Sequence, residues 1–66
     1  MQLREFTHRV AGKFHHHAVF HLQDGTTKEG YMQPNDDQFV YLTTLSGESG
    51  GAVAIADITS VEFPED

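Results

Sequence analysis

The sequence predicts a mainly β fold, in which an N-terminal α-helix precedes a five-stranded, strongly bent antiparallel sheet that closes into a small barrel. Two observations along the chain predict this fold: the spacing of its apolar residues and the short turn sequences between them. Apolar residues recur every three or four positions up to residue 12, and every second position beyond it, with short turn sequences between the runs. No repeat, linker or low-complexity tract divides the 66 residues. We therefore expect a single domain, with the helix over residues 1–12 and the barrel strands over 14–63.

The helix is predicted from an apolar stripe. Leu3, Phe6 and Val10 stand at positions i, i+3 and i+7, with charged residues between them, and Gly12 is a natural end for the helix. A helix of about three turns is not stable alone in water. Its apolar stripe must therefore lie on the sheet.

The strands are predicted from alternating apolar residues separated by turn sequences. Asp24-Gly25 is the dipeptide most typical of a tight hairpin turn. A strict two-residue turn there would place Met32 on the face opposite Leu22, so either a β-bulge corrects the register or both faces are partly covered. Gly30 inside a strand indicates a sharp bend or a close neighbour. The expected strands are residues 18–23, 26–32, 38–44, 52–56 and 58–63, with a glycine-rich loop over 45–51.

Length and composition limit the class of protein. A chain of 66 residues with 38% hydrophobic residues builds only a small core, so association with a second copy is plausible on physical grounds. The absence of cysteine excludes disulfides and zinc fingers and fits a reducing compartment. No apolar run reaches the length of a membrane span, and no signal-peptide core follows Met1. We therefore expect a soluble, cytoplasmic protein.

Charge is distributed unevenly along the chain. The formal net charge is −6, which repels a phosphate backbone unless the cations gather on one surface. All lysines, arginines and histidines lie within the first 28 residues, and only acidic charges follow. This uneven distribution of charge fits head-to-tail association of copies, or binding of a basic partner by the C-terminal half. It also fits an ordinary solvated surface. The cations are Arg4, Arg9, Lys13 and Lys28.

Three stretches of the chain carry a resemblance to a known family. The segments VFHLQDG (19–25), EGYM (29–32) and DQFVYL (37–42) resemble the first motif of Sm-like proteins. The closing segment VAIADITSVEF (53–63) is similar to the last two strands of Sm-like and related SH3-like small β-barrels. The resemblance covers about residues 12–63, and the family also has a helix before its strands. It implies an Sm-like or SH3-like small barrel.

The RNA site of that family is not matched. Sm-like proteins that bind RNA carry a basic residue and glycine in their second motif, or a Lys-His pair in the bacterial RNA chaperone. This chain has Ile55, Ala56 and Asp57 there, without a cation. Asp37 and Gln38 match only loosely the acidic and asparagine pair that holds a base in the family. The resemblance therefore implies the fold without the RNA site.

Four histidines form the most conspicuous cluster. On a strand, His15, His17 and His21 would point to one side and His16 to the other, and imidazoles at alternate positions can share a divalent metal. No third acidic ligand can be identified from the sequence, so a solvated or interface patch and adventitious metal binding remain open, and we expect no cofactor. Protonation of these side chains below about pH 6.5 would make association pH-dependent.

Two further motifs are better explained as loops. Residues 47–51 match G-x-S-x-G, but every histidine precedes Ser49, and the elbow of an esterase needs a strand-turn-helix setting with a later histidine. Asn35, Asp36 and Asp37 lack the ligand spacing of a calcium loop and favour a turn. We therefore expect no enzyme activity.

Aromatic residues provide the candidate interaction site. If Val40 and Leu42 face the core, Phe39 and Tyr41 face away from it, and Tyr31 on the neighbouring strand can join them. Such residues anchor protein interfaces, stack on bases or pack under a loop, and the acidic charge favours a protein partner.

The sequence thus predicts a non-enzymatic interaction module that self-associates through an edge strand and its exposed aromatics. The alternative is an Sm-like RNA-binding protein that uses Arg4, Arg9, Lys13 and the histidines.

Overall fold

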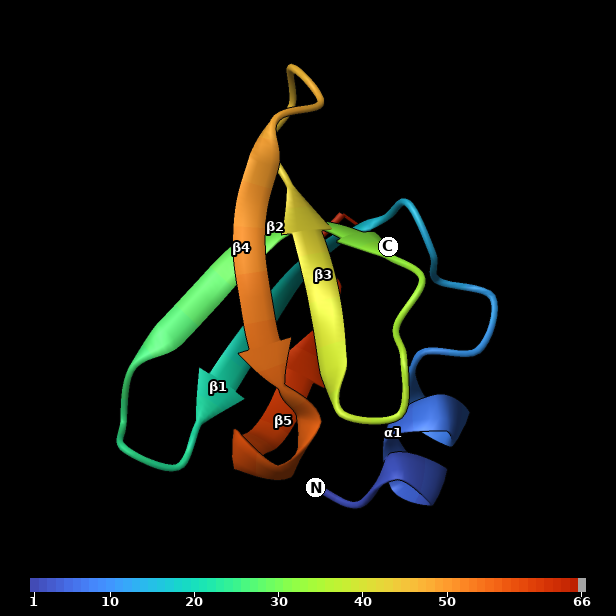
Figure 1. The fold of residues 1–66 in the computed structure, drawn as a ribbon, viewed down its shortest axis with the longest axis vertical. Helices are drawn as coiled ribbons and strands as arrows, with labels where there is room; N and C mark the ends of the chain where they lie inside the picture. The colour runs from blue at the N-terminus through green and yellow to red at the C-terminus, as the bar shows by residue number, and fades with distance from the viewer. Residues whose placement is uncertain (66) are drawn as a thin grey trace.

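Five strands form one antiparallel sheet, and a short helix precedes it (Figure 1). The structure is a computed structural model, and it describes residues 1–65. The strands lie in the order β4-β3-β2-β1-β5. The elements are α1 (Leu3–Arg9), β1 (His17–Leu22), β2 (Thr27–Gln33), β3 (Phe39–Thr43), β4 (Ser49–Ala54), the 3-10 turn η1 (Ile55–Asp57) and β5 (Ile58–Glu62).

The sheet is open. The helix and the five antiparallel strands are confirmed, but the expected strong curl and closure into a barrel are not: β4 pairs with β3, β5 pairs with β1, and both remain edges. The turn η1 separates β4 from β5 and directs β5 to the far edge of the sheet, beside β1 (Figure 1). A single copy therefore leaves two strand edges unpaired by any strand within residues 1–65.

The β1–β2 hairpin has a three-residue loop instead of the strict two-residue turn. The Leu22 N–H donates to the Thr26 carbonyl at 2.9 Å, and the Gly25 N–H donates to the Leu22 carbonyl at 3.0 Å. Gly25 has a φ of +89°, a left-handed conformation that glycine adopts without strain. The extra loop residue corrects the register, so that Met32 lies on the core face and is fully buried.

Gly30 marks a close approach of two strands. A Cβ at this position would lie 3.0 Å from the Thr43 carbonyl oxygen and 3.1 Å from Leu42 Cβ. Of the two explanations that the sequence leaves for this glycine, the structure supports the close neighbour, because β2 and β3 pair directly beyond it.

The β3–β4 hairpin differs from the sequence prediction at its loop. Strand β4 begins at Ser49, three residues earlier than expected, and ends at Ala54, where η1 replaces the last predicted strand residues. Gly51, which has a φ of +100°, pairs with Leu42. The register then shifts at a bulge, so that the next residue of β3, Thr43, pairs with Ser49. The two glycines after Ser49 thus belong to an irregular strand rather than to a loop.

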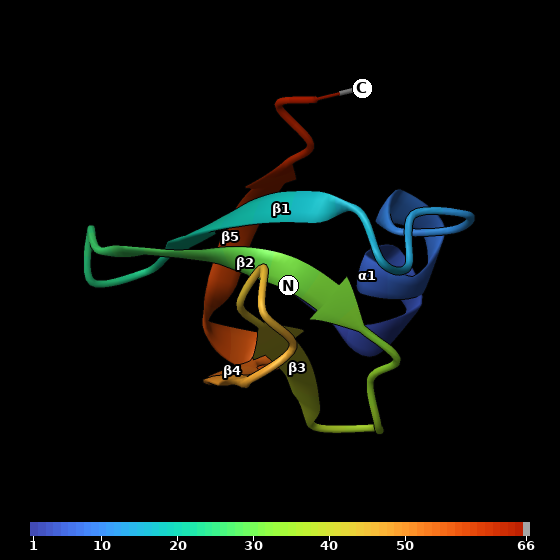
Figure 2. The same ribbon diagram turned by 90° about the horizontal axis from the view of Figure 1, so that it is seen from above.

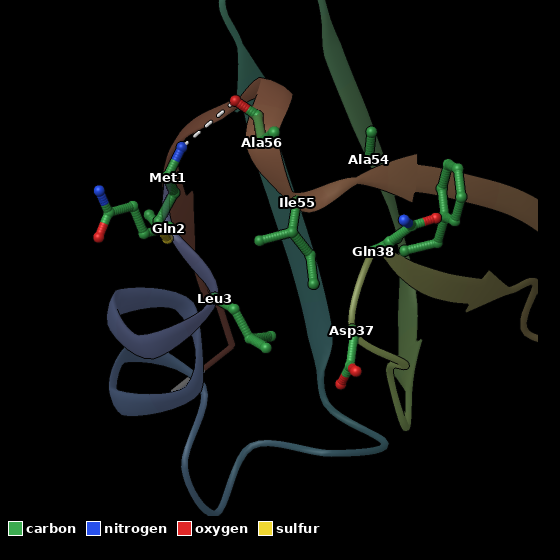
Figure 3. A pocket seen from close by; sticks show the side chains of 9 residues that line it. Met1, Gln2, Leu3, Asp37, Gln38, Ala54, Ile55 and Ala56 are labelled. Carbon is green, nitrogen blue, oxygen red and sulfur yellow. Dashed lines mark hydrogen bonds between the residues drawn. The ribbon is translucent and has the colours of Figure 1, made fainter.

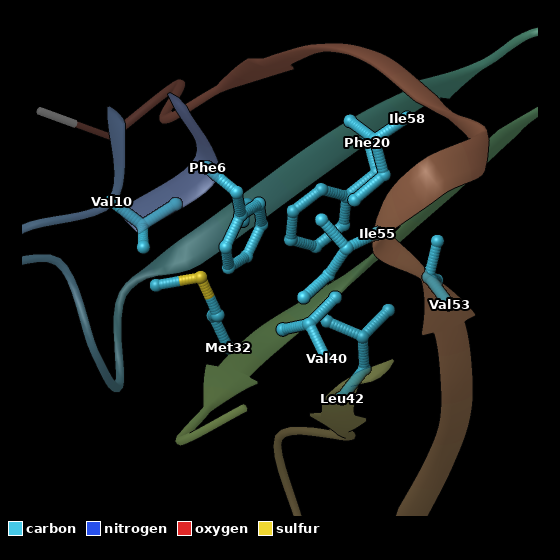
Figure 4. Packing of buried hydrophobic residues seen from close by; sticks show 10 residues of the cluster. Phe6, Val10, Phe20, Met32, Val40, Leu42, Val53, Ile55 and Ile58 are labelled. Atoms are coloured by element: carbon cyan, nitrogen blue, oxygen red, sulfur yellow. The ribbon is translucent and has the colours of Figure 1, made fainter. Parts of the chain in front are cut away.

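Two of the three residues of the predicted apolar stripe pack on the sheet, whereas Leu3 is 37% exposed. Phe6 and Val10 are buried, and the Phe6 ring stacks on Phe20 with centroids 6.3 Å apart (Figure 4). The helix is shorter than predicted, since it ends at Arg9, and Gly12 follows with a φ of +75°. From above, α1 lies beside the start of β1 and the end of β2 (Figure 2). The buried core consists of Phe6, Val10, Ala18, Phe20, Met32, Val40, Leu42, Val53, Ile55 and Ile58.

The two faces of the sheet differ in character. The inner face carries the core, and alternate residues along each strand point to the opposite, outer face. By this alternation and the strand register, the outer face holds His17, Val19, His21, Glu29, Tyr31, Phe39, Tyr41, Ala52, Ala54 and Glu62.

Within residues 1–65, no helix is long and apolar enough to cross a membrane.

Candidate interaction surface

The free edge of β4 is formed by two alanines. The Ile55 N–H donates to the Gln38 carbonyl at 2.9 Å, which fixes one hydrogen-bonded pair of the antiparallel ladder. Hydrogen-bonded pairs alternate with non-bonded pairs, so Val53 bonds to β3, whereas Ala52 and Ala54 direct their backbone polar groups away from β3. These groups are available to a further strand.

The free edge of β5 centres on Val61. The Leu22 N–H bonds to the Thr26 carbonyl of the β1–β2 hairpin, so alternate residues of β1 bond to β2 and the others to β5. Phe20 is one of the β1 residues whose backbone groups bond to β2, and its neighbour on β5 is Val61. The backbone polar groups of Val61 therefore point away from β1.

These edges have few of the features that prevent strand pairing. Proteins protect exposed edges with lysine, proline or inward-pointing charges. Strand β4 contains no charged residue and no proline, and Glu62 is the one charged residue of β5. Strand β4 does contain a bulge, and the Ile58 carbonyl of β5 accepts a hydrogen bond from the Met1 ammonium at 2.7 Å. The outward groups of Ala52, Ala54 and Val61 have no strand partner within residues 1–65.

Two aromatic side chains lie outside the core, as the sequence predicts, and the structure places them next to the β4 edge. Phe39 is 40% exposed and Tyr41 is 42% exposed, while Val40 and Leu42 between them are buried. Phe39 pairs with Ala54 and Tyr41 pairs with Ala52 across the β3–β4 ladder. Because the alanines are small, the two rings stay accessible from the side of the free edge.

Asp36 holds this aromatic strand in place. Its Oδ2 accepts a hydrogen bond from the Tyr41 hydroxyl at 2.6 Å, and its Oδ1 accepts bonds from the Gln38 and Phe39 N–H groups at 2.8 and 2.6 Å. The Tyr41 hydroxyl and then the two backbone N–H groups lower the pKa of Asp36. The same hydrogen bond raises the pKa of Tyr41. The carboxylate thus fixes both the start of β3 and one aromatic side chain.

Tyr31 lies on the same face of the sheet as Phe39 and Tyr41, and its ring contacts a histidine. It lies on the outer face, is half-buried, and contacts the His17 ring with centroids 5.6 Å apart. The third predicted interaction residue thus has a histidine as its ring partner.

The predicted histidine cluster is divided by the structure. His15 lies before β1 with a φ of +72°, so only His17 and His21 share the outer face. His17 Nε2 lies 3.3 Å from Glu29, and His21 Nε2 lies 3.1 Å from Glu62. Within residues 1–65, no group of three or more potential metal ligands is assembled.

Two of the three basic residues named for RNA binding contact other side chains. Arg9 lies 3.5 Å from Glu5 on the exposed side of α1. The Lys13 ammonium lies over the Phe63 ring, 5.6 Å from its centroid. Arg4 is exposed on the helix.

A pocket of about 500 Å³ opens at the N-terminal end of β3 (Figure 3). We call it the β3 pocket. The sequence did not predict a cavity here. The resemblance to Sm-like proteins nevertheless drew attention to four of its residues, at 37–38 and at 55–56. The pocket exists because the Ile55 N–H to Gln38 carbonyl bond brings these two places together. Its walls include Leu3, Asp37, Gln38, Phe39, Ala54, Ile55 and Ala56.

Comparisons of the chain with protein-family models, with curated proteins and with solved structures found no match.

Proposed function

We propose that the chain is a non-enzymatic protein-interaction module that assembles with copies of itself by pairing the β4 edge of one copy with the β5 edge of the next. The observation that carries this proposal is the open sheet, which leaves the outward polar groups of Ala52, Ala54 and Val61 without a strand partner within residues 1–65. Pairing with another strand would satisfy these groups through backbone hydrogen bonds.

Pairing of β4 with β5 is favoured over pairing of β4 with itself. A symmetric β4–β4 contact would satisfy one edge of each copy and leave β5 open. A head-to-tail contact satisfies both edges of every internal copy. Such a contact generates a ring when the rotation between copies closes, and a filament when it does not. The small core of a 66-residue chain adds a reason to assemble, because each contact removes further apolar surface from water.

The aromatic pair next to the β4 edge supports the same arrangement. Side chains of an added strand would lie beside Ala52 and Ala54 on the outer face. Because both residues are small, the incoming side chains would reach the Phe39 and Tyr41 rings, and large aromatic residues anchor protein interfaces efficiently. The edge would thus provide backbone hydrogen bonds, and the rings would provide apolar contact.

We also propose that the chain is a distant Sm-like or SH3-like small β-barrel protein. The segment 37–42, which resembles the first Sm motif, forms the entry to β3 and most of that strand. The segment 53–63 forms the end of β4, η1 and β5, in line with the resemblance of this region to the closing strands of the family. Assembly between copies would extend the sheet that a single copy leaves open.

Sedimentation equilibrium of one variant and its matched control tests the assembly. Ala54 has a φ of −68°, which proline adopts without strain, and its N–H points away from β3. Ala54→Pro would therefore remove the outward donor and leave the fold intact, whereas Ala54→Ser would keep the donor. We expect the wild type and Ala54→Ser to form oligomers, and Ala54→Pro to sediment at 7.4 kDa with an unchanged circular dichroism spectrum.

An oligomer of the same mass in all three proteins would contradict pairing at the β4 edge. A wild-type mass of 7.4 kDa would contradict self-association itself.

A further inference from the structure

We propose that the β3 pocket binds an arginine or lysine side chain presented by a partner protein. This inference goes beyond the proposed self-association because it names a side chain that the pocket binds, although the pocket shares Phe39 and Ala54 with the β4 edge. The occupant is defined by three properties of the pocket: apolar walls, one uncompensated carboxylate and the acidic charge of the chain.

The walls of the pocket fit an aliphatic chain. Leu3, Phe39 and Ile55 contribute apolar surface, and the volume of about 500 Å³ is open to solvent. Leu3 and Phe39 are among the exposed large hydrophobic residues, at 37% and 40%. Lysine and arginine cover apolar surface with their methylene stems while their charged ends stay in water. Such a stem matches an open apolar pocket better than a compact polar group does.

Asp37 provides the partner for the charged end. It is exposed and makes no hydrogen bond or ion pair within residues 1–65. The neighbouring Asp36 has both of its oxygens bonded inside the fold. Asp37 therefore takes no part in the hydrogen bonds of the turn within residues 1–65, and its carboxylate lies at the wall of an apolar pocket, where it can pair with an incoming cation.

The pocket contains one positive group of its own, and this group is already bonded. The Met1 ammonium donates to the Ile58 carbonyl at 2.7 Å and lies 3.4 Å from the Ala56 carbonyl. Figure 3 shows Met1 and Asp37 on opposite sides of Ile55. No lysine or arginine lines the pocket. The Asp37 side of the pocket is thus anionic.

The charge of the whole chain favours a basic protein over a nucleic acid. With a formal net charge of −6, the chain attracts cationic side chains over a distance and repels phosphate groups. Phe39 and the Gln38 amide could also contact a base, but no cation of the pocket wall is available for the phosphate backbone. A basic protein segment is therefore the occupant that the charges favour.

An NMR titration with two matched ligands tests the proposal. The probes are the capped tripeptides Gly-Arg-Gly and Gly-citrulline-Gly, which have nearly the same shape and differ in charge. We expect the arginine peptide to shift the amide signals of Leu3, Gln38 and Ile55 and to bind about fivefold more tightly than the citrulline peptide, since an ion pair at a surface is worth up to about 1 kcal/mol.

The variants Asp37→Asn and Glu48→Gln identify the carboxylate. Both remove one negative charge, but Glu48 lies in the exposed β3–β4 loop, away from the pocket. We expect Asp37→Asn to abolish the preference for arginine and Glu48→Gln to retain it. Equal loss in both variants, equal binding of the two peptides, or shifts outside the pocket would overturn the proposal.

An oligouridylate in place of the peptides tests the other occupant. Pocket shifts with this RNA and none with the arginine peptide would likewise overturn it. Because the pocket shares Phe39 and Ala54 with the β4 edge, the titration is carried out at a protein concentration at which sedimentation shows a monomer. Its result is then separate from that of the self-association experiment.

Discussion

The Tyr41 hydroxyl donates to Oδ2 of Asp36 across 2.6 Å, and this contact joins the turn before β3 to the aromatic surface beside the β4 edge. Oδ1 of the same carboxylate caps two N–H groups at the start of the strand. One ionised side chain thus orders the turn, the strand entry and an exposed ring. Its protonation state should therefore affect the stability of this end of the sheet.

The first prediction concerns acid. Hydrogen bonds from Tyr41, and then from the Phe39 and Gln38 N–H groups, hold the pKa of Asp36 below its ordinary value of 3.8. A lowered pKa in the folded state contributes stability above pH 3.8, and this stability is lost as the pH falls through the folded pKa. We expect Asp36→Asn to lower the urea midpoint at pH 6 and to weaken its dependence on pH between 2 and 4. Parallel pH profiles for the wild type and the variant would contradict this role.

The second prediction concerns Tyr41 in alkali. The bond to Asp36 favours the neutral phenol and raises the pKa of Tyr41 above its ordinary value of 10.0. The associated stability is therefore present below pH 10.0 and is lost as the pH rises through the raised pKa. In a Tyr31→Phe background, ultraviolet absorption at alkaline pH reports Tyr41 alone. We expect Asp36→Asn to lower the pKa of Tyr41 in this assay. An unchanged titration would show that the bond is absent in solution.

The third prediction concerns the helix. Phe6 is fully buried and stacks on Phe20, so Phe6→Ala should lower the free energy of unfolding by about 3–5 kcal/mol. In a domain of this size such a loss would leave much of the chain unfolded. Phe14→Ala is the control, because Phe14 is 36% exposed. Urea unfolding monitored by circular dichroism measures both, and similar losses in the two variants would contradict the packing of α1 on the sheet.

The fourth prediction concerns Gly30. A methyl group there would meet the Thr43 carbonyl oxygen at 3.0 Å, so Gly30→Ala should lower the free energy of unfolding by about 1–3 kcal/mol, although alanine usually stabilises a strand relative to glycine. Thr27→Ala on the same strand is exposed and should have a much smaller effect. Increased stability in Gly30→Ala would show that β2 and β3 do not approach this closely.

The sequence patterns were informative where local chemistry decides the structure. The stripe of Leu3, Phe6 and Val10 predicted a helix on the sheet, and alternation around Val40 correctly placed Phe39 and Tyr41 outside the core. The same patterns did not predict how the strands end and pair. Whether Asp24-Gly25 closes a two- or three-residue loop depends on one residue of register, which neither periodicity nor turn propensity determines.

Sequence patterns also could not predict that the sheet stays open or that the β3 pocket forms. Closure would require β4 to pair with β5. The 3-10 turn over residues 55–57 separates these strands, and the sequence IAD contains no motif that predicts such a turn. The pocket depends on a backbone bond between Gln38 and Ile55, which are distant in sequence. Similarly, the alternation of His15, His17 and His21 assumed a strand that begins two residues later in the structure.

Hydrogen exchange at the free edges tests the account most directly. In a single copy, the outward N–H groups of Ala54 and Val61 have no strand partner within residues 1–65, so they should exchange rapidly in dilute solution. Edge-to-edge assembly predicts that both amides become protected as the protein concentration rises, while the buried Val40 amide is protected at every concentration. Rapid exchange of both edge amides at every concentration would contradict assembly through β4 and β5.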